Sequence, residues 1–135
     1  MNNASELIVY KASAGSGKTF TLAVEYIKLL ILNPRAYRNI LAVTFTNKAT
    51  TEMKERILSQ LYGIASGDKA SDAYLKNIKM GVGFSEDEIR EKAARALSFL
   101  IHDYSFFRVE TIDSFFQSVM RNLARELGLG ANLEI

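Results

Sequence analysis

The feature that most constrains this chain is a short loop rich in glycine and serine, ASAGSGKT, at residues 12–19. It fits the pattern of a phosphate-binding loop, with Ala12 where the strict form has glycine. Gly15 and Gly17 let the backbone curl so that successive N–H groups point inward at a phosphate. A β-branched run precedes the loop and a helical pattern follows it, so the positive N-terminus of that helix faces the same phosphate. This context favours phosphate binding over a simple flexible turn.

Lys18 and Thr19 supply the side-chain chemistry at the end of the loop. The Lys18 amine is expected to reach the β- and γ-phosphates of a nucleoside triphosphate, and the Thr19 hydroxyl to be a ligand of Mg²⁺. Both are therefore the predicted catalytic residues. The predicted nucleotide-binding residues are Ala14, Gly15, Ser16, Gly17, Lys18 and Thr19.

The rest of the chain alternates between short apolar runs and patterns of helical period, which predicts an α/β fold with a parallel sheet covered by helices. The run ILAVT at residues 40–44 is apolar on both faces, as in a buried strand. Thr46 or Asn47 can cap the helix after it, and Ser85 with Glu88 forms a capping box for a later helix. The predicted strands are 7–11, 40–44 and 107–112, and the predicted helices are 18–32, 47–65, 72–80, 86–101 and 113–127.

Punctuating residues and apolar positions refine these helices. Asn33-Pro34 is expected to stop the first helix, Gly67 the second, and Gly128 with Gly130 the last. The apolar positions of the second helix are Met53, Ile57 and Leu61, and those of the helix after the capping box are Ile89, Ala93, Leu97 and Ile101.

Composition excludes several classes of function. The 135 residues contain no cysteine and one histidine, which excludes a disulfide scaffold, a thiolate zinc site and a histidine-rich metal site. With 17 basic and 15 acidic residues, any basic surface must be local. The longest apolar stretch, residues 22–32, contains Glu25 and Lys28 and is too short and too polar for a membrane span. No secretory signal is recognisable at the N-terminus, so the cytoplasm is the expected compartment.

Three segments together resemble the N-terminal motor domain of superfamily 1 DNA helicases. They are ASAGSGKTFTLAVEYIKLLI, ILAVTFTNKATTEMKERI and VETIDSFFQSVMRNLARELG. The RecB and AddA subunits of helicase–nucleases look most similar, and UvrD, Rep and PcrA are more distant; the resemblance covers about residues 8–130. It implies a RecA-like P-loop NTPase domain that uses ATP and Mg²⁺. The whole chain, residues 1–135, would be the N-terminal part of this domain, with a helical insert at about residues 66–104.

The resemblance also implies a track for DNA. Residues 44–49 match the motif that lies on single-stranded DNA in such helicases, and Thr111 to Phe115 match a later DNA-contacting segment, with Asp113 where histidine is usual. Both segments follow strands, and ligands of parallel sheets gather beyond the carboxyl ends of the strands. The predicted DNA-binding residues are Thr44, Phe45, Thr46, Asn47, Lys48, Thr111 and Asp113.

Each of these residues also has a simpler structural interpretation. Phe45 could stack on a base or pack in the core. Thr46 and Asn47 could hold a phosphate at the N-terminus of the next helix or only cap it. Lys48 could meet the adjacent phosphate or be a solvated lysine. These alternatives stay open at the level of sequence.

Asp113 is expected to be a helix N-terminal acid, stabilised by the helix dipole, rather than the Mg²⁺-organising carboxylate of an ATPase. The strand before it contains Arg108 and Glu110, whereas such a carboxylate normally follows a nearly continuous apolar strand. The hydrolytic carboxylates and the second motor domain of the resembled family are not recognisable in the sequence. The end at Ile135 is therefore predicted to be artificial or truncated, the domain incomplete and the 135-residue chain inactive by itself.

The function expected from the resemblance is that of the ATP-binding part of an ATP-dependent DNA helicase in repair and recombination. The full-length parent would be the enzyme, with an exonuclease activity as a further expectation, acting on single-stranded or duplex-end DNA beside a second helicase–nuclease subunit. Two alternatives share the phosphate loop: a small P-loop kinase and a non-catalytic nucleotide-binding interaction module. A kinase should carry an arginine-rich lid, and Arg90, Arg95 and Arg108 are too scattered to form one.

Overall fold

A computed structural model describes residues 6–9 and 17–128 of the chain. These residues form a helix-rich α/β fold, and its elements follow the predicted order. The strands are β1 (Glu6–Val9), β2 (Ile40–Thr44) and β3 (Arg108–Thr111), and the α-helices are α1 (Gly17–Leu32), α2 (Asn47–Ser66), α3 (Asp72–Gly81), α4 (Glu86–His102) and α5 (Ile112–Glu126). Short 3₁₀ turns occur at η1 (Ala36–Asn39), η2 (Lys69–Ser71) and η3 (Tyr104–Phe106).

The described strands form one parallel sheet in the order β1-β2-β3. Ala42 of β2 is paired with Ile8 of β1 and with Val109 of β3, so β2 is the central strand. Every residue of β2 is buried, which confirms the prediction from its continuous apolar run.

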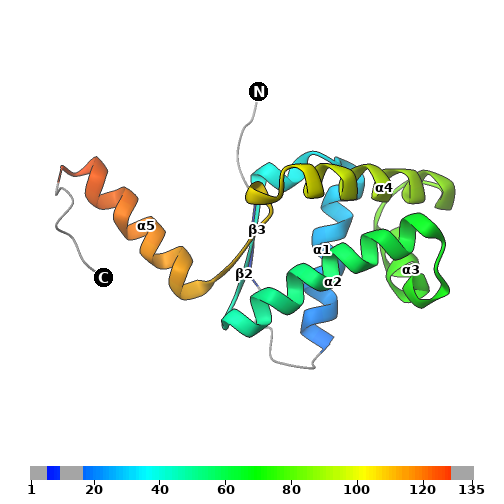
Figure 1. Ribbon diagram of the computed structural model, residues 1–135, viewed down its shortest axis with the longest axis horizontal. Coiled ribbons are helices and arrows are strands. Elements are labelled where there is room, and N and C mark those ends of the chain that lie inside the picture. The colour runs from blue at the N-terminus through cyan, green and yellow to red at the C-terminus, as the bar shows by residue number, and fades with distance from the viewer. Residues whose placement is uncertain (1–5, 10–16, 129–135) are drawn as a thin grey trace.

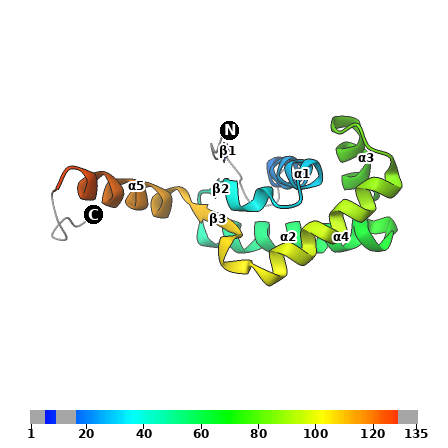
Figure 2. The same ribbon diagram turned by 90° about the horizontal axis from the view of Figure 1, so that it is seen from above.

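Helices α1 to α4 lie together on one side of the strands, and α5 extends away on the other side (Figure 1). Figure 2 shows the same arrangement after a quarter turn. Helix α1 is buried on most of its circumference and belongs to the same apolar core as the inner positions of α2 and α4. The fully buried residues of α1 are Leu22, Ala23, Tyr26, Ile27, Leu30 and Ile31. Among the described residues, no helix is long and apolar enough to cross a membrane.

The local signals in the sequence end the helices where they were expected. Helix α1 ends at Leu32, directly before Asn33-Pro34. Helix α2 is followed by Gly67, which has a left-handed backbone with φ of 78°. The capping box that opens α4 is complete, because the Glu88 N–H donates to Ser85 Oγ and the Ser85 N–H donates to the Glu88 carboxylate.

The buried stripe of α4 differs from the predicted one. Ile89 and Ala93 are buried as expected, but the stripe continues through Ala96 and Leu100, while Leu97 is half-buried and Ile101 is 59% exposed. A helix turns by 100° per residue, so each step of four residues drifts by 40° and three such steps leave the core-facing side. Alternating steps of four and three residues keep the stripe on one face, whereas the predicted stripe used steps of four alone.

A polar clamp joins η1 to the end of α4. The Tyr37 hydroxyl donates to Asp103 Oδ2 at 2.7 Å, and Arg38 Nε donates to the same oxygen at 2.9 Å. The guanidinium of Arg38 also lies over the ring of Phe106, 4.4 Å from its centroid. The Tyr37 hydrogen bond, followed by that of Arg38, holds the pKa of Asp103 below its usual range. No sequence pattern predicts this clamp, because its two halves lie more than 60 positions apart.

Candidate functional site

The carboxyl ends of the strands meet at one edge of the sheet. Thr44 and Thr111 are paired across β2 and β3, and each is the last residue of its strand. Helix α2 begins after Thr46 and helix α5 directly after Thr111. The first turns of α1, α2 and α5 all lie at the lower end of the molecule in Figure 1. Backbone N–H groups at helix N-termini carry a partial positive charge, so this edge suits anions.

The N-terminus of α1 is the part of this edge that follows the predicted phosphate loop. Residues 12–16 lie outside the described residues, and so does the side chain of Lys18. The helix itself begins at Gly17, and its first turn carries no acidic residue. Thr19 lies in that turn and is only 8% exposed, which makes it one of the few buried polar residues of the described chain. A buried hydroxyl beside an N-terminus without acids fits a phosphate group and its metal ion.

The segment after β2 changes abruptly from buried to exposed. Thr44 is 1% exposed, whereas Phe45 is 51% exposed and the next residues, Thr46 to Lys48, are all exposed. Core packing of Phe45, one of the two interpretations of its sequence position, is therefore wrong. Lys48 makes no ion pair among the described residues. An aromatic ring and a cation thus face solvent close together in sequence at the beginning of α2.

Hydroxyl groups fix the backbone of this exposed segment. Thr46 is the N-cap of α2, and its Oγ1 accepts a hydrogen bond from the Ala49 N–H at 3.0 Å. The buried Thr44 hydroxyl lies 2.6 Å from Thr50 Oγ1 and 3.3 Å from the Thr46 carbonyl oxygen. The Thr50 hydroxyl donates to the same carbonyl at 3.1 Å. Thr50 was not among the predicted site residues, although a threonine four residues after another residue in a helix often bonds to that residue's carbonyl.

The turn after β3 repeats the same capping chemistry. Thr111 is the N-cap of α5, and its Oγ1 accepts from the Ser114 N–H at 3.1 Å. Asp113 is exposed in the first turn of α5, as predicted for a helix N-terminal acid. Its carboxylate makes the N-terminus of α5 less attractive to anions than the N-termini of α1 and α2.

Strong electrostatic perturbation lies away from this edge. Desolvation raises the pKa of the buried Tyr26, which packs against Phe107 in the core. The hydrogen bond from the Ser85 N–H lowers the pKa of Glu88 within the capping box. Among the described residues, no cluster of acidic and histidine side chains could hold a metal ion by itself. Mg²⁺ at this edge would therefore be held with the help of nucleotide phosphates, and Thr19 is the described residue that fits it.

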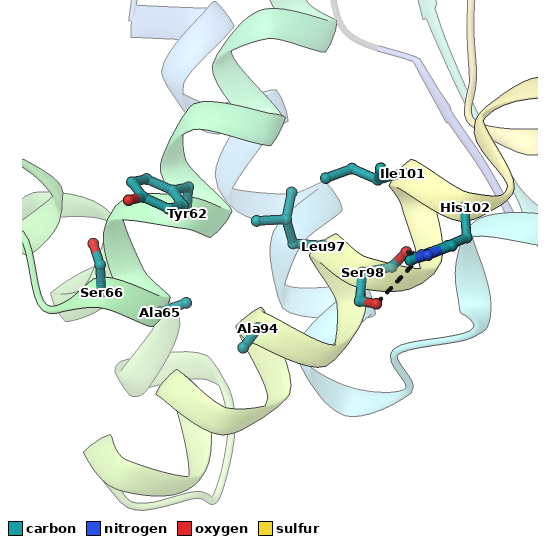
Figure 3. A pocket seen from close by; sticks show the side chains of 8 residues that line it. All are labelled: Tyr62, Ala65, Ser66, Ala94, Leu97, Ser98, Ile101 and His102. Atoms are coloured by element: carbon teal, nitrogen blue, oxygen red, sulfur yellow. Dashed lines mark hydrogen bonds between the residues drawn. The ribbon is translucent and has the colours of Figure 1, made fainter.

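A separate apolar groove lies between the last turns of α2 and the second half of α4 (Figure 3). Leu97 and Ile101, which the drift of the α4 stripe turns away from the core, line it together with Tyr62 and Ala65. The His102 ring lies at its end, with Nδ1 2.8 Å from the Ser98 carbonyl oxygen. The groove is lined by no acidic, lysine or arginine side chain, and it lies on the opposite end of α2 from the exposed segment after β2.

Comparison with known proteins identifies the class. The chain matches the UvrD/REP helicase N-terminal domain over residues 2–135. It is 27% identical to the RecBCD enzyme subunit RecB of Haemophilus influenzae over 97% of this chain and 12% of that protein. It is 40% identical to an ATP-dependent helicase/nuclease of Pediococcus pentosaceus over 57% of this chain and 6% of that protein. A probable DNA helicase II homolog of Rickettsia conorii is 47% identical over 42% of this chain and 9% of that protein.

The chain therefore belongs to the UvrD/REP helicase N-terminal domain family. This membership confirms the family resemblance that the three sequence segments indicated. The chain spans about an eighth or less of the length of these curated relatives. No solved structure matches it significantly.

Proposed function

We propose that the chain is the ATP-binding part of an ATP-dependent DNA helicase with a RecA-like P-loop NTPase fold. Family membership and the N-terminus of α1 support this proposal. That helix starts at the end of the predicted phosphate loop, has no acid in its first turn, and carries the buried Thr19 hydroxyl. Residues 14–19 would hold the nucleotide, with Lys18 on the β- and γ-phosphates and Thr19 on Mg²⁺.

The bound nucleotide would supply the free energy of phosphoryl transfer, and the residues of this chain would bind and orient it. Backbone N–H groups of the loop and of the first turn of α1 would point at the phosphates. Lys18 would neutralise phosphate charge. Phosphoryl transfer depends on several charges that are positioned at once, so hydrolysis is assigned to the full-length protein and not to this chain alone.

The exposed segment after β2 would be a track for single-stranded DNA. The observation that carries this assignment is the abrupt change from the buried Thr44 to the exposed Phe45, Asn47 and Lys48 at the N-terminus of a helix without acids in its first turn. Aromatic stacking on bases combined with cationic contacts to phosphates is how proteins bind single strands without sequence preference. Thr111 and Asp113 lie at the end of the adjacent strand, where the same strand of DNA would continue.

The sequence similarity to RecB and to an ATP-dependent helicase/nuclease supports a more specific role. The full-length protein would act on single-stranded or duplex-end DNA in repair and recombination. Its partner would be a second helicase–nuclease subunit, and its compartment would be the cytoplasm. An exonuclease activity would reside outside these 135 residues.

The experiment that tests nucleotide binding is the substitution Lys18→Ala in the full-length protein. We expect ATP hydrolysis to be abolished and the fold to be retained, because the change removes a phosphate-binding cation and no core volume. Lys76→Ala, at an exposed position of α3, is the matched control and should leave hydrolysis unchanged. Near-normal hydrolysis by a folded Lys18→Ala variant would contradict the assignment of the phosphate loop.

A further inference from the structure

The side chain of Phe45 is half-exposed, so its own packing does not fix its direction. What fixes it is the backbone on either side. Thr44 is anchored in the central strand by its pairing with Thr111. Thr46 is anchored to α2 as its N-cap. The two anchors belong to different elements, and a hydrogen-bond network between them determines how the intervening residue is presented.

Thr50 is the residue that connects these anchors. Its hydroxyl lies 2.6 Å from the Thr44 hydroxyl, at the end of β2, and 3.1 Å from the Thr46 carbonyl oxygen, before α2. The Thr50 N–H also donates to that carbonyl, at 3.0 Å. With the Thr44 hydroxyl 3.3 Å away, the Thr46 carbonyl has three polar hydrogens within reach, two of which come from Thr50. One residue thereby ties the strand, the turn and the first turn of the helix.

We propose that Thr50 is a positioning residue for single-strand binding: its hydroxyl holds the turn that presents Phe45 and Lys48 to DNA. The inference rests on the proposed DNA track and adds to it a residue outside the matched DNA-binding segment. Thr50 itself does not touch DNA. It acts by reducing the number of conformations that the turn must give up when a base stacks on Phe45, which is preorganisation of a binding surface.

The chain offers a set of closely matched variants. Thr50→Val removes the hydroxyl and keeps the β-branched shape, so the intrinsic helix propensity hardly changes. Thr50→Ser keeps the hydroxyl and removes a methyl group. Thr51→Val makes the same chemical change at the neighbouring position, which is exposed. The buried Thr44 hydroxyl keeps its contact with the Thr46 carbonyl in all three variants, so the fold should persist.

Two measurements on the full-length protein test the inference. Hydrogen–deuterium exchange with mass spectrometry reports the order of residues 44–52, and fluorescence anisotropy with a labelled oligo-dT strand reports affinity. For Thr50→Val we expect faster exchange in that peptide and a dissociation constant raised roughly 3- to 10-fold, the equivalent of one lost hydrogen bond. Thr50→Ser should restore affinity to within about 2-fold, and Thr51→Val should match the unmodified protein.

The possible results separate this inference from the proposed function. If Phe45→Ala and Lys48→Ala weaken binding while Thr50→Val does not, the DNA track stands and the positioning role of Thr50 is refuted. An equal loss in Thr51→Val would also refute it, because the effect would then belong to the helix in general. If none of the variants changes DNA affinity, the proposed track itself fails, and the inference fails with it.

Discussion

Phe45→Ala is the perturbation that distinguishes a DNA-binding surface from an ordinary exposed turn. The ring is 51% exposed and lies between two anchored threonines. Full burial of a phenylalanine side chain is worth about 1.5–3 kcal/mol, so removal of a half-buried ring should lower the free energy of unfolding by only about 1 kcal/mol. Stacking of a base on an aromatic side chain is worth about 1–3 kcal/mol. The loss in DNA affinity should therefore be about 5- to 150-fold, larger than any effect on the fold.

The assay is fluorescence anisotropy of a labelled single strand with the full-length protein, with thermal unfolding measured in parallel. Tyr62→Ala is the matched control, because Tyr62 is also a solvent-exposed aromatic residue of the α2 region, 65% exposed, but lies at the apolar groove. We expect Tyr62→Ala to leave DNA affinity unchanged. Equal affinities of the unmodified protein and a folded Phe45→Ala variant, or equal losses in both variants, would refute the stacking argument.

Two further substitutions test the electrostatics of the site and the packing of the fold. Lys48→Ala should lower the slope of log affinity for single-stranded DNA against log salt concentration by about 0.7, because one fewer counterion is released; ATP affinity without DNA should stay constant, and an unchanged slope in the salt series would mark Lys48 as a bystander. Gly63→Ala should destabilise the chain by about 1 kcal/mol in thermal unfolding, since the added Cβ would lie 2.0 Å from the buried Ser71 Oγ and overpacking outweighs the gain in helix propensity. Gly83→Ala, where the added Cβ meets nothing within 4 Å, is its control, and a stabilised Gly63→Ala variant would contradict the packing argument.

Sequence patterns predicted the elements whose signals are local. The run ILAVT forms the central strand because all five positions are buried and the pattern has no polar face to place. Helix α2 begins after Thr46 and is followed by Gly67, because capping and left-handed backbone depend on residues within one turn of the helix end. The exposure of Phe45 was left open at the level of sequence, since an aromatic residue after a buried strand can point either way.

Features that depend on distant residues could not be predicted. The clamp formed by Tyr37, Arg38 and Asp103 requires that η1 and the end of α4 meet, and no local pattern announces that meeting. The groove between α2 and α4 likewise arises from a drift of about 40° at Leu97 and Ile101 relative to the buried stripe. The network at Thr50 has a local component, but its link to Thr44 depends on how the strand turns into the helix.

The three helix N-termini at the carboxyl edge are not equivalent, and their differences suggest how ligands divide between them. The first turns of α1 and α2 carry no acid, whereas that of α5 carries the exposed Asp113. A phosphate would be attracted to the first two and repelled by the third. This order fits a nucleotide at α1 and a DNA phosphate at α2. Contact between Asp113 and DNA would then require a hydrogen-bond donor, such as an amino group on a base, because a carboxylate only accepts.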